Sequence, residues 1–134
     1  MVRKNKVFWL KCSFLIGAIT DALALIPMLS PIAAKIMWGF DSFSQSYYFA
    51  MGYGSSLMFG WTILLIWAFK KPLERTNVAL LTIIVIIGLV ATEVITSING
   101  FIEIHKLIPT LILQTILLVL FSFSYFGKII DRNY

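Results

Sequence analysis

Four long apolar stretches constrain this chain more than any other feature, because each has the length of a membrane crossing. A helix needs about 20 apolar residues to cross the hydrocarbon core of a bilayer. Overall, 60% of the residues are hydrophobic and 13% are charged. In soluble domains, roughly 45–50% of the residues are apolar and about 25% are charged. We therefore expect the 134 residues to form one all-α integral membrane domain, a four-helix up-down bundle. The expected spans are about Val7–Leu29, Tyr47–Phe69, Asn77–Ile98 and Leu107–Gly127.

Lysine and arginine fall unevenly on the segments between these spans. Basic residues gather before the first span, between the second and third, and after the fourth, whereas the other two connections hold only Lys35 and Lys106. Basic residues favour the cytoplasmic side of a membrane. We therefore expect a multi-pass protein of the inner membrane with the N- and C-termini in the cytoplasm. In the middle turn, Lys70, Lys71 and Arg75 are expected to contact anionic lipid headgroups.

The longest connection joins the first and second spans and has two interpretations. Ile32, Ile36, Phe40 and Phe43 recur in it at near-helical spacing, and Trp38 lies among them. That spacing fits a short amphipathic helix in the membrane interface, with the indole at the headgroups. An irregular loop fits the composition equally well.

Each span places a polar side chain at a similar depth, and two of these side chains are acids. At a rise of about 1.5 Å per residue, Asp21, Ser56, Glu93 and Gln114 lie roughly 20–24 Å from the basic end of their spans. An ionised side chain near the bilayer centre costs about 2.5–3.5 kcal/mol, so intramembrane acids usually serve a function. Two ionised acids at one depth would repel, so we expect at least one of them to hold a proton. Trp61 is a candidate wall for the same site, able to cover a cation, although ordinary core packing explains it too.

The functional expectation is a site that binds or transports a proton, a cation, or an amine-bearing or lipid-like small molecule. The alternative is a structural or assembly subunit of a membrane complex, in which the same polar groups only join helices, at about 0.6 kcal/mol per hydrogen bond. An enzyme ranks third, because no nucleophile–base pair or phosphate-binding glycine loop stands out.

Cysteine and histidine occur once each, as Cys12 and His105. A single cysteine excludes an internal disulfide, and a single histidine excludes a bis-histidine haem. No cofactor or metal is expected. The chain also lacks an arginine-rich patch with interleaved aromatics, so nucleic acid is not an expected partner.

Small residues mark two faces for close helix packing. Gly52, Ser56 and Gly60 recur every four residues in the second span, and Gly88 begins a similar series in the third. Such stripes let helices approach closely in lipid, either within one chain or across a homodimer. The charged turn after the second span is short, which predicts that the second and third helices are antiparallel neighbours.

Three segments resemble an uncharacterised family of small prokaryotic four-span membrane proteins. They are Gly17–Leu23, Met51–Thr62 and Lys71–Arg75, and the resemblance covers about half of the chain. It implies the four-span fold and no activity.

Two characterised groups also place acids inside a small membrane bundle. The small multidrug exporters have an essential acid in their first helix, as Asp21 is here, but this chain has a longer first outer loop, a stronger charge bias and none of their helix motifs. The sterol-isomerase and emopamil-binding group has a histidine and tryptophan constellation that this sequence lacks.

Overall fold

The computed structural model of the chain describes residues 2–130 and is built of helices. Four of them are long and apolar enough to cross a membrane, which confirms the expected four-helix bundle and identifies a multi-pass membrane protein. The fifth, α2, is short and lies between the first two spans. The helices are α1 Val2–Leu29, α2 Pro31–Trp38, α3 Gln45–Lys70, α4 Thr76–Ile98 and α5 Ile104–Ile130.

Two of the long helices extend past the boundaries expected from hydropathy. The first begins at Val2 rather than Val7, and the fourth runs from Ile104 to Ile130 rather than from Leu107 to Gly127. Hydropathy marks the part of a helix that suits lipid, whereas the backbone hydrogen bonds of a helix continue through polar residues. His105 consequently lies in the first turn of α5, where a loop was expected.

The connection between the first two spans contains a helix, which decides between the two interpretations above. Ser30 is its N-cap, with the hydroxyl accepting the N–H of the third helical residue at 3.4 Å. Pro31 occupies the first helical position, where its missing N–H costs nothing. Gly39 ends the helix in the left-handed region at φ 75°. Ile32 and Ile36 project from one face and are both 75% exposed, as suits a helix against lipid.

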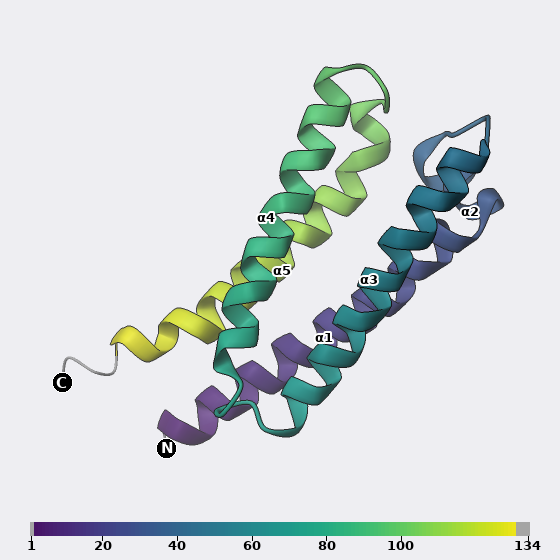
Figure 1. Cartoon of the computed structure of the whole chain (residues 1–134). Coiled ribbons are helices and arrows are strands. Elements are labelled where there is room, and N and C mark those ends of the chain that lie inside the picture. Colours follow the sequence, from purple (N-terminus) through teal and green to yellow (C-terminus); the bar gives the residue numbers. More distant parts are fainter. Residues whose placement is uncertain (1, 131–134) are drawn as a thin grey trace.

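The four spans form two antiparallel pairs, α1 with α3 and α4 with α5 (Figure 1). The pairs meet at the end of the bundle that holds the N-terminus and the α3–α4 turn, residues 71–75, which we call the basic end. There α1 also packs against α5. Toward the other end, which holds α2 and is called the α2 end, the pairs diverge. The expectation that α3 and α4 are close neighbours is therefore only partly met: they run antiparallel, but their interior faces contact α1 and α5, and they touch each other little.

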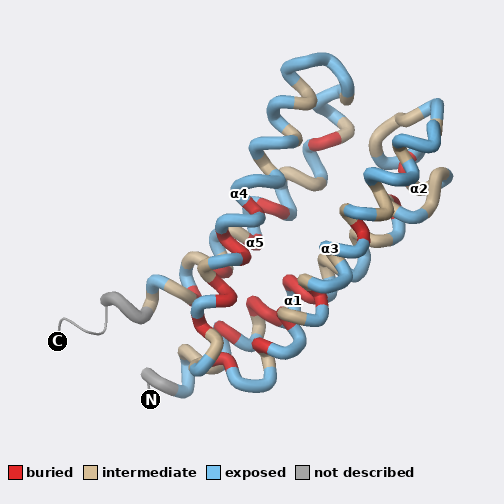
Figure 2. The backbone as a smooth tube through the Cα atoms, viewed as in Figure 1, coloured by how far each residue is buried: buried red, intermediate tan, exposed pale blue. Residues whose placement is uncertain are grey.

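The apolar core lies toward the basic end, where residues from all four spans meet (Figure 2). In α4 every buried residue precedes Ile87, and the segment from there to Ile98 contains none. Dispersion forces between close-packed side chains hold membrane helices together, since lipid tails are as apolar as the core. The basic end therefore carries most of the packing energy. The core residues are Leu10, Phe14 and Ala18 of α1, Leu65 and Ala68 of α3, Val78, Ala79, Ile83 and Ile86 of α4, and Leu117 and Phe121 of α5.

Candidate binding site

Asp21 lies on the interior face of α1, one turn beyond the packed core. Phe14, Gly17 and Ala18 are buried on this face, and Asp21 follows Gly17 at a spacing of four residues, which keeps it on the same side of the helix. Its side chain is half-buried. Within residues 2–130 it has neither a hydrogen-bond nor an ion-pair partner. The acid is thus positioned by the helix but not neutralised by a neighbour.

Glu93 and Gln114 are in direct contact across α4 and α5. Gln114 Nε2 donates a hydrogen bond to Glu93 Oε1 at 2.8 Å. The amide is only 8% exposed and Glu93 is half-buried. The other oxygen of each group, Glu93 Oε2 and Gln114 Oε1, is also buried, and neither finds a partner in the described part of the chain. Two residues predicted from sequence alone therefore form one polar centre.

The depth of Asp21 relative to this centre follows from the contact between α1 and α5. A Cβ built on Gly17 would lie 2.9 Å from Phe121 Cζ, so Gly17 is level with the end of the Phe121 ring. Toward the α2 end, Asp21 lies four residues beyond Gly17 and Gln114 seven residues from Phe121, about 6 Å and about 10 Å at the helical rise. The two polar groups thus lie within about 5 Å of each other in depth. They belong to different helix pairs, and no hydrogen bond joins Asp21 to Glu93 among the described residues.

Ser56 does not join this centre. Its side chain is exposed, and its hydroxyl donates to the carbonyl of Gly52 in its own helix at 2.9 Å. The neighbouring Ser55 is the buried serine of α3, and it too donates to the Gly52 carbonyl. Depth was estimated from sequence, but the side of the helix on which each serine lies depends on how α3 is rotated against α1.

Trp61 of α3 packs against the core, and its indole N–H is hydrogen-bonded to a residue of α4. Its Nε1 donates to Thr82 Oγ1 at 3.3 Å, and Thr82 in turn donates to the carbonyl of Val78. Thr82 precedes Glu93 by eleven residues, about 16 Å along the helix. The indole therefore links α3 to α4 near the basic end, away from the Glu93–Gln114 contact.

The glycines of the predicted packing stripes face open space. A Cβ added at Gly52, Gly60 or Gly88 would meet nothing within 4 Å, so no described part of the chain packs closely there. Within the four spans, the close approaches are made at Gly17 and at Gly54, where a Cβ would lie 2.7 Å from the end of the Met28 side chain. Spacing alone did not distinguish a glycine at a helix crossing from one on an outer face.

A pair of serines near the basic end escaped the sequence analysis. Ser13 of α1 and Ser124 of α5 are buried, and their hydroxyls lie 2.6 Å apart. Each hydroxyl also lies within hydrogen-bond distance of a carbonyl of its own helix, so one serine donates to the other and the second donates to a carbonyl, which satisfies both and links two helices. In the sequence, Ser13 lies between Cys12 and Phe14, and Ser124 lies between Phe123 and Tyr125. Serine is common on either face of a membrane helix, so these neighbours did not mark the pair.

The charged turn at the basic end is partly engaged within the protein. Arg75 lies over Trp67, with Cζ 3.4 Å from the ring centroid, and donates to the Trp67 backbone carbonyl. Lys71 forms an exposed ion pair with Glu74 at 3.2 Å, while Lys70 is exposed. Arg75 therefore satisfies a carbonyl at the end of α3, and the two lysines remain at the surface.

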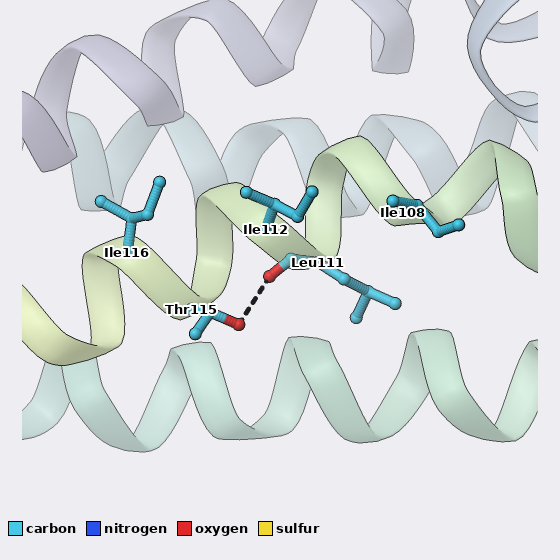
Figure 3. A pocket seen from close by; sticks show the side chains of 5 residues that line it. All are labelled: Ile108, Leu111, Ile112, Thr115 and Ile116. Atoms are coloured by element: carbon cyan, nitrogen blue, oxygen red, sulfur yellow. Dashed lines mark hydrogen bonds between the residues drawn. The ribbon is translucent and has the colours of Figure 1, made fainter.

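A groove of about 290 Å³ lies along one side of α5 (Figure 3), and neither Glu93 nor Gln114 is among its lining residues. Its lining is aliphatic apart from one hydroxyl, which donates to a carbonyl of the same helix at 2.8 Å. The groove thus offers no free polar group to orient a ligand. Its lining residues are Ile108, Leu111, Ile112, Thr115 and Ile116.

The described residues contain no group of three or more histidine, cysteine, aspartate or glutamate side chains that could hold a metal ion. Comparisons with models of protein families, with curated proteins and with solved structures find no match to this chain. The resemblance to the small four-span family therefore stays a prediction, and the geometry of the polar groups is the basis for any functional proposal.

Proposed function

We propose that this membrane protein binds or transports a proton, a cation or an amine-bearing small molecule between its two helix pairs. The observation that carries the proposal is the Glu93–Gln114 contact, which stands at nearly the depth of Asp21 and leaves two buried oxygens with no donor among the described residues. Asp21 would meet the ligand from α1 and Glu93 from α4. Gln114 would hold the Glu93 carboxyl in place.

The charge of the two acids favours a positively charged ligand. No basic side chain among the described residues is paired with Asp21 or Glu93. In a medium of low dielectric constant an unpaired carboxylate is costly, and a cation or a proton reduces that cost.

A structural or assembly role is the second candidate, and one observation favours it. The face of α3 with Gly52, Ser56 and Gly60 has no close neighbour among residues 2–130, as expected if a helix of another subunit or a second copy packs there. In that case the Glu93–Gln114 bond would serve only to join α4 to α5.

Binding of tetraphenylphosphonium by the purified protein in detergent separates these two roles. This permanent lipophilic cation should bind the wild-type protein, and D21N and E93Q should each weaken binding by roughly tenfold or more, since each removes a carboxylate that can pair with the bound cation. E103Q, which alters an exposed acid outside the core, is the matched control. Binding that is absent in the wild type, or unchanged in both variants, would leave the structural role.

The orientation with both termini in the cytoplasm, in a cell inner membrane, is part of the same proposal. It rests on the basic residues at the basic end, where the exposed Lys70 and Lys71 would contact anionic headgroups. Labelling of single cysteines placed in the α3–α4 turn and in the α4–α5 loop, from each side of intact cells, tests it directly.

A further inference from the structure

The unpartnered oxygens at the Glu93–Gln114 contact indicate the chemical state of the acid. Gln114 Nε2 uses one of its hydrogens on Glu93 Oε1. Glu93 Oε2 and Gln114 Oε1 are both acceptors, so neither satisfies the other while Glu93 is a carboxylate. Buried acceptors are nearly always paired, because an unpaired one loses its hydrogen bonds to water without replacement. A proton on Glu93 Oε2 would turn that oxygen into a donor for Gln114 Oε1, so that both would be paired.

The described side chains around the contact supply no such donor from a charged group. On α1, the helix opposite, the ionisable group at this depth is Asp21, which is itself an acid. On α5, His105 and Lys106 lie about 12 Å or more toward the α2 end, counted at the helical rise from Gln114. On α3, Tyr53 is 65% exposed. The lysines of α1 and α3 lie toward the basic end.

We infer that the resting protein holds a proton on Glu93 Oε2, which donates to Gln114 Oε1 and closes a ring of two hydrogen bonds between acid and amide. Both orphan oxygens are then satisfied, and α4 is joined to α5 by a pair of bonds. The occupant of the site in the resting state is therefore a proton.

A consequence for ligand binding rests on the proposed function. When a cation binds at Glu93, the acid releases its proton to water and the carboxylate pairs with the cation. One proton leaves for each positive charge that enters, so the charge of the site is unchanged. Binding of this kind is an exchange of cation for proton, and it strengthens as the pH rises.

Infrared spectroscopy of the detergent-solubilised protein at neutral pH tests the proton directly. The wild type should show a carbonyl band of a protonated carboxylic acid that shifts in D₂O, and E93Q should remove it while E103Q leaves it in place. Q114L should move the band to higher frequency, because the acid carbonyl loses the hydrogen bond from the amide. A spectrum without a band that E93Q removes would overturn the inference.

Stability of the variants gives a second readout that does not depend on a ligand. Glutamine at position 93 can form the same two bonds to Gln114 as a protonated acid, so E93Q should unfold at the wild-type temperature, whereas E93L should unfold at a lower one. Equal losses in E93Q and E93L would contradict the acid–amide ring.

Proton release on tetraphenylphosphonium binding separates this inference from the proposed function. The charge of this probe does not vary with pH, so protons detected by an indicator dye come from the protein. Cation binding without a Glu93 acid band refutes the inference and keeps the function. An acid band without cation binding refutes the function and keeps the proton on Glu93.

Discussion

The basic end and the α2 end of the bundle differ in how closely their helices pack. At the basic end, side chains from all four spans interlock, and the polar groups there, such as Ser13 and Ser124, are fully satisfied by one another and by carbonyls. Toward the α2 end the helix pairs separate, and no residue of α4 beyond Ile86 is fully buried. There Glu93 Oε2 and Gln114 Oε1 have no partner among the described residues. The packing at the basic end therefore stabilises the fold, and the candidate site lies in the more loosely packed part toward the α2 end.

The largest effect should come from removing an aromatic ring from the core. Phe121 is fully buried and packs edge-on against Phe14, with ring centroids 6.1 Å apart. F121A should lower the free energy of unfolding by about 3–5 kcal/mol, because it leaves a cavity between α1 and α5. Equilibrium unfolding in mixed micelles measures this. F101A, at a residue 77% exposed in the α4–α5 loop, should change stability by less than about 0.5 kcal/mol.

A bulky residue at the crossing of α1 with α5 should lower the free energy of unfolding by less than F121A does. It should again affect the basic end more than the α2 end. A side chain at Gly17 meets the buried Phe121 ring and a methyl group of Leu65 at 2.9–3.1 Å, and neither can move aside easily. G17V should therefore destabilise by about 1–3 kcal/mol. The matched variant G88V enters open space and should unfold like the wild type. Equal losses in the two would mean that the helix pairs do not meet at Gly17.

The serine pair should contribute a smaller, measurable coupling. S13A and S124A each remove one partner of the 2.6 Å contact, and the double mutant should lose less than the sum of the two. Interhelical hydrogen bonds in membranes average about 0.6 kcal/mol and reach about 1.7 kcal/mol, which sets the coupling expected from a double-mutant cycle. T92A removes a hydroxyl that bonds only within α4 toward the α2 end, and it should have no coupling partner.

The smallest effect should come from surface cations at the two ends. R75A removes a guanidinium stacked on Trp67, which is worth about 0.5–1 kcal/mol at an exposed site. K35A removes the exposed ion pair of Lys35 with Asp41, for which about 0–1 kcal/mol is usual, with many such pairs near zero. Thermal unfolding in low and high salt distinguishes them, since salt screens the ion pair and leaves the stacked contact largely intact.

The residues predicted for the site illustrate what a depth estimate can and cannot supply. Asp21, Glu93 and Gln114 lie on the interior faces of their helices, and Glu93 and Gln114 are in contact. Ser56 has a suitable depth but lies on the outside of α3, and Trp61 points its N–H at Thr82. Residue counting measures position along an axis, whereas contact also needs the rotation of each helix, and a difference of one residue turns a side chain by about 100°.

The sequence by itself determined the membrane spans, their number and the depth of the acids, because lipid selects for length and hydropathy along one dimension and the helical rise converts residue number into height. The C-terminal end of α4 is also set by nearby residues. Asn99 and Gly100 end the helix through backbone hydrogen bonds, with Gly100 at φ 71°. Only the tertiary structure decided that the spans pair as α1 with α3 and α4 with α5, and that Gly17 rather than Gly52 or Gly60 makes the close contact. Those choices depend on which faces interlock most completely, a property of all four helices together that no single stretch of residues contains.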